Sequence, residues 1–153
     1  MRDPSQAPTG ASRQALDGLD FFQRVMSGEI ASAPMADLLG LRITEVARGR
    51  IVIGGTATEQ FYNGLGIAHG GFAATMLDTA LGCAINTLQP AGRVFTTLEL
   101  KINYTRPLTR ESGELRCEAT VLHAGSRTAT AEARLVDAHG RLCAHATTTC
   151  IVA

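Results

Sequence analysis

The sequence has no tryptophan, few other aromatic residues and no excess of either charge. Lys plus Arg and Asp plus Glu number 14 each, so the formal net charge of the 153 residues is zero. Without an overall field, we expect neither nucleic acid nor a membrane surface as a partner, and local groups must hold any anionic ligand. Hydrophobic residues make up 45% of the chain, which is ample for one core at this length.

Long hydrophobic runs are also absent. The longest weakly polar stretch, residues 70–85, is shorter than the ~20 residues that span a bilayer. The N-terminus stays polar through Asp17 and lacks the ~7 to 15 apolar residues of a secretory signal. The four cysteines show no CxxC spacing, which favours buried thiols in a reducing compartment. We therefore expect a cytoplasmic protein with no membrane segment.

Several catalytic motifs are missing as well. The four histidines form no HxH or HExxH motif, and no cysteines stand at metal-ligand spacing. A GxSxG elbow for a nucleophilic serine is absent, as is a glycine-rich phosphate loop with a lysine. We expect no metal and no cofactor.

Apolar periodicity divides the chain into two short helices, two strands, one long helix and four further strands. Residues 1–13 contain too few apolar side chains to pack, so we expect a disordered tail there and one domain over residues 14–153. Helical spacing in the first helix ends at Gly28, and the second helix is expected over residues 34–39. The strands expected from alternation and turn signals are residues 41–47, 50–58, 98–105, 114–121, 128–135 and 141–152.

The long helix is expected over residues 70–88, where apolar side chains cover much of its circumference. In the strand that follows, Leu98, Leu100, Ile102 and Tyr104 alternate with polar residues, which predicts one apolar face and one wet face. A sheet with one apolar face can curl around such a helix and bury it. The expected fold class is α+β, an antiparallel sheet wrapped around a long central helix.

The long helix contains a single charged side chain, a carboxylate. Asp78 is the only charged side chain between Gly70 and Gly92. Burying a carboxylate without partners costs several kcal/mol, so this acid requires hydrogen-bond donors or a function. The alternative interpretation places Asp78 on a polar stripe that faces solvent, together with Thr75, Thr79 and Asn86.

A short motif precedes the helix: Asn63 and Gly64, then His69, Gly70 and Gly71. Two glycines allow a ligand to approach the backbone closely. The first N–H groups of a helix have no internal partner and carry the positive end of its dipole, so they suit a developing oxyanion. By itself the glycine pair favours an ordinary turn from a loop into a helix.

Taken together, these residues resemble the hotdog thioesterases of the phenylacetic-acid-degradation (PaaI-like) family. That family has an Asn, then HGG, then an acid nine positions after the His on the central helix, as at Asn63, His69 and Asp78 here. The order of elements from residue 41 to residue 152 is also similar. The resemblance implies a single hotdog fold and an acyl-CoA thioesterase.

The resemblance also implies a role for each residue of the motif. Asp78 would be the general base or the nucleophile on the thioester carbonyl. The backbone N–H of Gly71, with Gly70 as a further donor, would hold the carbonyl oxygen. Asn63 would orient the carbonyl or the attacking water, and His69 would mainly be a structural hydrogen-bonding residue. In this family the acid and the oxyanion donors come from opposite subunits, which implies a homodimer or homotetramer.

Another residue of the family supplies a hydroxyl from the strand that follows the helix. Counting back from Tyr104 and Pro107, Thr97 aligns best with that position. Thr96 is the alternative, because the alignment needs one extra residue between helix and strand.

Coenzyme A brings phosphates, which points to local arginines. Arg106 precedes a proline at a strand end, and Ser126 and Arg127 stand in a hairpin of the kind that this family often uses near the nucleotide. Arginine grips phosphate through its forked donors. For the acyl group, Phe61 and Tyr62 could line a pocket for an aromatic or a medium-length chain.

Two other functions are compatible with the same fold. A hotdog dehydratase or hydratase acting on hydroxyacyl thioesters also pairs a loop His with a helical acid, although the His-to-Asp spacing and the HGG motif favour a thioesterase. A non-catalytic acyl-CoA-binding protein would bind the same ligand without releasing the thiol.

Overall fold

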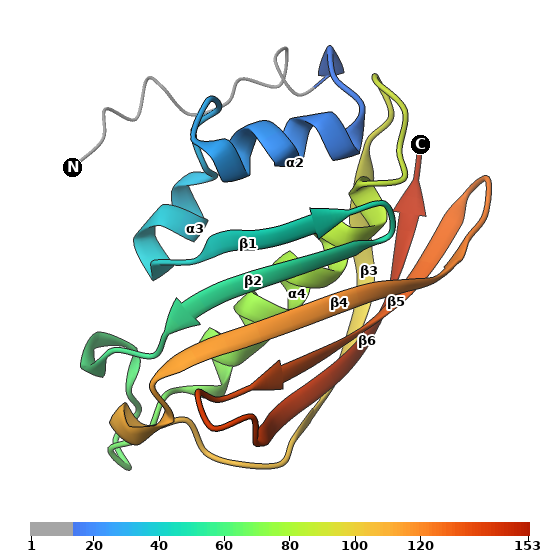
Figure 1. Ribbon diagram of the computed structural model, residues 1–153. Helices are drawn as coiled ribbons and strands as arrows, with labels where there is room; N and C mark the ends of the chain where they lie inside the picture. The colour runs from blue at the N-terminus through green and yellow to red at the C-terminus, as the bar shows by residue number, and fades with distance from the viewer. Residues whose placement is uncertain (1–13) are drawn as a thin grey trace.

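The computed structural model describes residues 14–153, and the tail expected over residues 1–13 lies outside them. The expected α+β fold is confirmed: six antiparallel strands form one sheet around a long helix (Figure 1). The helices are α2 (Gly18–Ser27), α3 (Pro34–Leu39) and α4 (Gly70–Asn86). The strands are β1 (Arg42–Ala47), β2 (Arg50–Thr56), β3 (Phe95–Tyr104), β4 (Glu114–Ala124), β5 (Thr128–Val136) and β6 (Leu142–Val152). Two single-turn 3₁₀ helices are Glu59–Phe61 and Arg110–Ser112.

The short helices end where the sequence contains glycine. Gly28 and Gly40 adopt positive φ angles of 83° and 67° and close α2 and α3. A left-handed residue at this position satisfies the last carbonyl groups of a helix, and glycine adopts it without strain. At the start of α2, the Asp17 side chain accepts a hydrogen bond from the Asp20 N–H at 2.9 Å. Both helices therefore have the boundaries that their caps dictate.

The central helix α4 is the core of the fold. Its sheet-facing residues are almost fully buried, among them Met76, Leu77, Leu81 and Ile85. The helix also contains several alanines, which are the strongest helix formers. At its C-terminal end, the Thr87 hydroxyl donates to the Ala84 carbonyl, which closes the helix two residues before the expected end.

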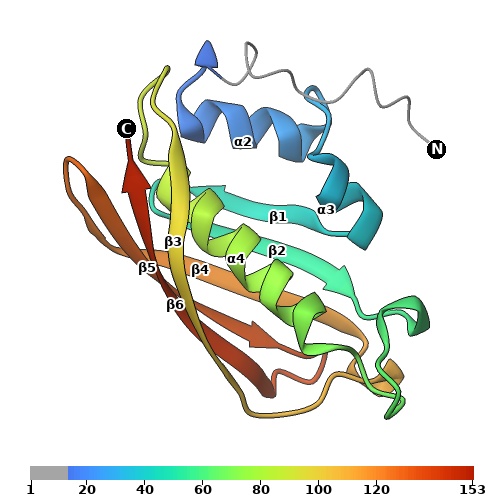
Figure 2. The ribbon, with the colours of Figure 1, turned by 180° about the vertical axis from the view of Figure 1, so that it is seen from behind.

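The strands follow the order β1-β2-β4-β5-β6-β3, so β3 is an edge strand although it directly follows α4 in the chain. Figure 2 looks onto the side of α4 that faces away from the sheet, with β3 beside it. The outer edge of β3 leaves its backbone N–H and C=O groups without a strand partner among residues 14–153. Such an edge is a ready template for pairing with another chain.

The expected alternation of β3 is wrong at Leu98. Leu98 was expected on the buried face, but it is 58% exposed. Tyr104 lies on the helix side as expected, because its hydroxyl reaches the Gly70 carbonyl, although it is 55% exposed at the end of the strand. The register with β6 shifts between Thr97 and Glu99, which is a β-bulge at Leu98. A bulge inserts one extra residue and reverses the alternation beyond it.

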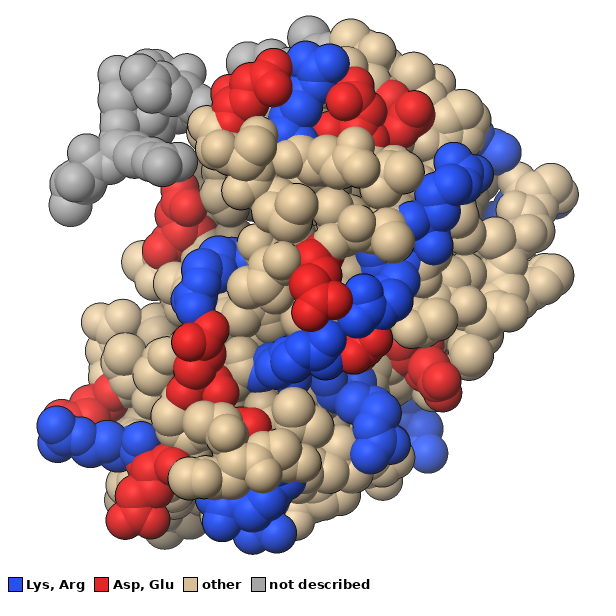
Figure 3. Space-filling view, viewed as in Figure 1, with Lys and Arg blue, Asp and Glu red and all other residues tan. Residues whose placement is uncertain are grey.

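Charged residues of both signs cover the convex face of β1, β2 and β4 (Figure 3). Arg50 pairs with Glu45 at 2.9 Å and with Glu118 at 2.6 Å. Arg116 contacts the same two carboxylates at 3.1 and 2.5 Å. This is the polar, solvent-facing side of the sheet that the strand alternation predicts. No helix among residues 14–153 is both long enough and apolar enough to cross a bilayer.

Candidate active site

The Asp78 side chain is half-buried on α4 and has a hydrogen-bond donor on β3. The Thr97 hydroxyl donates to Asp78 Oδ1 at 2.9 Å. The Cys150 sulfur on β6 lies 3.9 Å from the Thr97 oxygen. We refer to Asp78, Thr97 and Cys150 as the carboxylate group. A carboxylate with one fixed donor and access to solvent is suited to act as a general base or a nucleophile.

The bulge in β3 decides which threonine reaches Asp78. Thr97 is half-buried and faces α4, whereas Thr96 is exposed on the opposite face. With unbroken alternation from Leu100 backwards, Thr96 would face the helix and Thr97 would face solvent. The extra residue at Leu98 reverses this order.

A glycine on α4 sets the distance between helix and strand. A Cβ atom on Gly82 would lie 2.8 Å from Cε2 of Phe95, which is closer than side chains approach in practice. The Phe95 ring therefore packs directly onto the helix backbone, one turn beyond Asp78. Gly82 was not identified from the sequence, although a lone glycine within a helical pattern often marks such a close approach.

The thiols near the site remain protonated. Burial raises the pKa of Cys150, the neighbouring charges of Asp78 and Glu99 raise it further, and hydrogen bonds with Thr97 and Thr148 oppose the rise. Burial also raises the pKa of Cys143, which lies near the start of α4. A thiol is a poor nucleophile, so the carboxylate is the stronger candidate. Within residues 14–153, no three His, Cys, Asp or Glu side chains gather closely enough to hold a metal ion.

The second cluster lies at the N-terminus of α4 and consists of Asn63, His69, Gly70, Gly71 and Tyr104. We refer to it as the helix-tip group. His69 caps the helix, because its Nδ1 accepts the Gly71 N–H at 2.9 Å. The Tyr104 hydroxyl donates to the Gly70 carbonyl at 3.0 Å. Asn63 holds the preceding loop by accepting the Leu65 N–H at 2.9 Å.

The backbone N–H groups of Gly70 and Gly71 differ in whether they already have a hydrogen-bond partner. The Gly71 N–H points to the His69 ring and is occupied by it. The Gly70 N–H makes no hydrogen bond to residues 14–153. Glycine at position 70 also leaves room for Tyr104, since a Cβ there would lie 3.3 Å from the phenol ring. The Gly70 amide is thus the donor that a ligand can use without displacing another group.

A cavity of about 370 Å³ opens beside the helix tip. Its lining includes Asn63, Gly70, Tyr104 and Arg106. The Arg106 side chain is exposed at the end of β3, so it brings a positive charge to the rim. Phe61 and Tyr62 do not line this cavity. Phe61 instead stacks on Phe72 with ring centroids 5.0 Å apart.

The hairpin between β4 and β5 lies at the other end of β3. Ser126 and Arg127 stand in this hairpin, where the Ser126 carbonyl accepts a hydrogen bond from the Arg93 guanidinium at 2.8 Å. The Arg127 carbonyl accepts the Val152 N–H at 2.8 Å and ties the hairpin to the end of β6. Arg93 was not identified from the sequence. With Arg127 it brings a second cation to the end of β3 that lies nearest the carboxylate group.

The two groups of one chain are too far apart to act on the same carbonyl. Gly70 and Asp78 are eight residues apart on α4, which corresponds to about 12 Å at ~1.5 Å per residue. Thr97 and Tyr104 are seven residues apart on β3, or roughly 23 Å at ~3.3 Å per residue. An oxyanion donor must lie about 3 Å from the oxygen that it stabilises. Within one chain, therefore, the two groups do not form a single site.

The chain is similar to several known proteins. Residues 65–144 match the model of the thioesterase superfamily. A 1,4-dihydroxy-2-naphthoyl-CoA hydrolase of Listeria monocytogenes is 25% identical over 104 residues, covering 67% of this chain and 82% of its own.

Two solved structures of the phenylacetic acid degradation protein PaaI are also similar. A variant of the Thermus thermophilus protein is 30% identical with a TM-score of 0.71, covering 77% of this chain and 97% of its own. The Escherichia coli protein is 25% identical with a TM-score of 0.75, covering 88% and 92%. The chain therefore belongs to the thioesterase superfamily, as a PaaI-like hotdog protein whose general activity is thioester hydrolysis.

Proposed function

We propose that the protein hydrolyses acyl-CoA thioesters to the free acid and CoA. The observation that supports this most directly is the half-buried Asp78 carboxylate, held by the Thr97 hydroxyl at 2.9 Å. Asp78 acts either as the base that activates water or as the nucleophile on the carbonyl carbon. Thr97 fixes the position of one carboxylate oxygen and leaves the other for the reaction.

The helix tip stabilises the oxyanion in this proposal. The Gly70 N–H is the first donor, because it has no partner within the described chain. The Gly71 N–H becomes a second donor only if the His69 ring releases it. Asn63 orients the carbonyl or the water from the preceding loop, and His69 retains its capping role.

We further propose that the active site forms between two copies of the chain, in a homodimer or homotetramer. The exposed edge of β3 and the uncovered side of α4 supply a continuous surface for a second copy. Antiparallel pairing of two β3 edges would bring the start of one strand beside the end of the other. The carboxylate group of one copy would then lie near the helix tip of its partner.

The CoA moiety is proposed to bind through arginines at the rim of this joint site. Arg106 stands beside the cavity at the helix tip, and Arg127 with Ser126 stands beyond the carboxylate group. Arg93 is a further candidate. A CoA thioester as substrate is supported by the similarity to the Listeria hydrolase, and four thiols in the chain are consistent with the reducing cytoplasm.

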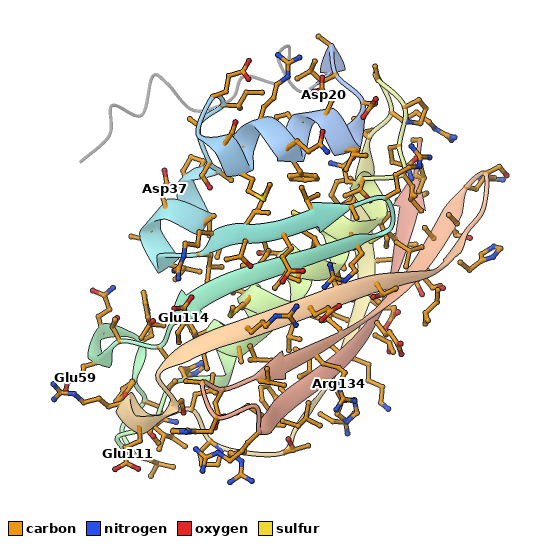
Figure 4. All side chains as sticks on the ribbon, in the orientation of Figure 1. Asp20, Asp37, Glu59, Glu111, Glu114 and Arg134 are labelled. Atoms are coloured by element: carbon orange, nitrogen blue, oxygen red, sulfur yellow. The ribbon has the colours of Figure 1, made fainter. Side chains whose placement is uncertain are left out.

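The test is release of free thiol from a panel of acyl-CoAs by the parent protein and by Asp78→Asn. We expect the variant to lose about 10²- to 10⁴-fold in kcat, the range for removing a general base. The matched control is Asp37→Asn, since Asp37 lies on the outer surface of α3, away from α4 (Figure 4). Its turnover should equal that of the parent.

Each other outcome has a distinct meaning. If Asp78→Asn keeps the turnover of the parent, the assigned role of Asp78 is wrong. If acyl-CoA binds but neither protein releases thiol, the chain is an acyl-CoA-binding protein. Hydration of an enoyl-CoA without thiol release would identify a dehydratase or hydratase instead.

A further inference from the structure

A second, smaller cavity lies beside α4, between this helix, α2, α3 and the strands β1 and β2. Its volume is about 90 Å³. Its walls include Phe21, Phe22 and Val25 of α2, Ala36 of α3, and Thr79 and Cys83 of α4. These walls are almost entirely apolar.

Two of the polar side chains that line this cavity are engaged elsewhere. The Thr79 hydroxyl donates to the Thr75 carbonyl at 2.7 Å, so the hydroxyl is satisfied within the helix. The Arg42 guanidinium pairs with Glu114 on the convex face of the sheet. A cavity with almost entirely apolar walls does not hold ordered water well, but it does take apolar ligands.

The cavity and the carboxylate group share the helix α4. Thr79, which lines the cavity, directly follows Asp78, and Cys83 stands one turn further along the same face. Successive helical residues are about 100° apart around the axis at ~1.5 Å rise, so the Thr79 wall of the cavity is adjacent along the axis to Asp78 and lies about 100° around the helix from it.

We propose that this cavity receives the distal end of the acyl chain and selects linear aliphatic chains over aryl groups. The inference rests on the proposed function and names its substrate class. An apolar protein cavity of ~150 Å³ accommodates benzene, so a volume of about 90 Å³ corresponds to roughly three or four carbon atoms. A linear chain fits such a space, whereas a phenyl ring exceeds it.

The N-terminal helices determine the depth of the cavity. Val25 of α2 is half-buried at one wall, and its replacement by alanine would extend the space. Ala36 of α3 is half-buried at another, where a leucine would occupy it. The two substitutions act in opposite directions on the same volume, which makes them a matched pair.

The experiment measures kcat/KM and, by calorimetry, the affinity for a ladder of linear acyl-CoAs from acetyl to decanoyl, with phenylacetyl-CoA added. In the parent, each added carbon should improve both quantities until the cavity is full, and then the gain should stop. In Ala36→Leu the gain should stop earlier, with the ratio of long-chain to acetyl kcat/KM falling about 10-fold or more. In Val25→Ala the gain should continue to longer chains. The control is Ala47→Leu, at an exposed position at the end of β1. It should show the same dependence on chain length as the parent.

Two results would overturn the inference: a chain-length profile that is the same in both cavity variants and the parent, or a higher kcat/KM for phenylacetyl-CoA than for every linear chain. Failure of the proposed function has a separate signature, since it gives no thiol release from any acyl-CoA. In that event the affinities measured by calorimetry across the acyl-CoA series still decide whether the cavity binds acyl chains.

Discussion

The helix-tip group and the carboxylate group lie on the same helix but are assembled in different ways. At the helix tip, consecutive residues cap their own helix, and the Gly71 N–H reaches a ring only two residues away. The carboxylate group depends on contacts across the fold: Asp78 and Thr97 are 19 residues apart, and Thr97 and Cys150 are 53 residues apart. The cap at the helix tip is therefore a local structure, to which Tyr104 of β3 adds a tertiary contact, whereas the carboxylate group is entirely a product of tertiary packing.

The two groups should therefore differ in how substitutions affect their geometry and the stability of the fold. The tip geometry depends on backbone conformation and a single cap, and it persists as long as the first turn of α4 forms. The carboxylate geometry depends on how closely β3 approaches α4, which the Gly82 and Phe95 contact determines. Substitutions at the tip should alter chemistry with little loss of stability, whereas substitutions around the carboxylate should alter both.

The largest effect should come from separating the two halves onto different chains. Asp78→Asn removes the carboxylate and Gly70→Pro removes the open amide, and we expect each variant alone to lose at least about 100-fold in kcat. After coexpression, each mixed dimer has one intact site of two, so the purified mixed dimer should recover about half of the parental activity. The measurement is thiol release by the purified mixed dimer, separated through two different affinity tags.

The outcome of this mixture is decisive for the subunit arrangement. If both halves of a site came from one chain, every site would carry a defect and the mixture would be no more active than the better variant. Recovery would show that each site draws on two copies.

The sequence predicts the elements well and the carboxylate group only in part. Periodicity locates both short helices, the long helix and all six strands, with deviations of up to three residues at their ends. The HGG motif predicts the tip because a cap is a local feature. The bulge at Leu98 leaves no clear local signal, and strict alternation would assign Thr96 to the buried face. Only the resemblance to a known family favoured Thr97.

Other parts of the site escape sequence reasoning for similar reasons. Gly82 matters because of Phe95, which is 13 positions later in the chain. Arg93 joins the hairpin at Ser126 through tertiary structure alone. The engagement of Gly71 by His69 was also not foreseen, and it changes which amide is available.

A second prediction distinguishes the two tip amides. Gly70→Pro should reduce kcat by about 10²- to 10³-fold, the usual cost of removing one oxyanion donor. Proline suits this position, because it is the first helical residue and His69 before it is extended with ψ 137°. His69→Ala removes only the acceptor that occupies the Gly71 N–H and leaves the Gly70 amide in place, so its loss should be much smaller. Equal losses in the two variants would contradict the assignment of Gly70 as the first donor.

The third prediction concerns the donor to the carboxylate. Thr97→Val keeps the shape but removes the hydroxyl, and a hydrogen bond to a charged group contributes about 1.5 to 3 kcal/mol. We expect kcat to fall roughly 10- to 100-fold, with KM changed much less. Thr97→Ser should restore most of the activity, and Thr96→Val should match the parent in the same thiol-release assay. A full effect at Thr96 would indicate that the bulge lies elsewhere in the active protein.

The smallest effect, and the most specific test of tertiary packing, is expected from Gly82→Ala. The added methyl group would meet the Phe95 ring at 2.8 Å and should destabilise the fold by about 1 to 3 kcal/mol as β3 moves away. Urea unfolding measures this loss, and kcat should fall with it because the Thr97–Asp78 hydrogen bond lengthens. Gly64→Ala is the control for stability, since a Cβ there contacts nothing within 4 Å.

Adding Phe95→Leu to Gly82→Ala makes room for the methyl group and should recover part of both the stability and kcat, because residues in contact are energetically coupled. Additive losses in the double variant would mean that the helix–strand contact does not control the position of Thr97.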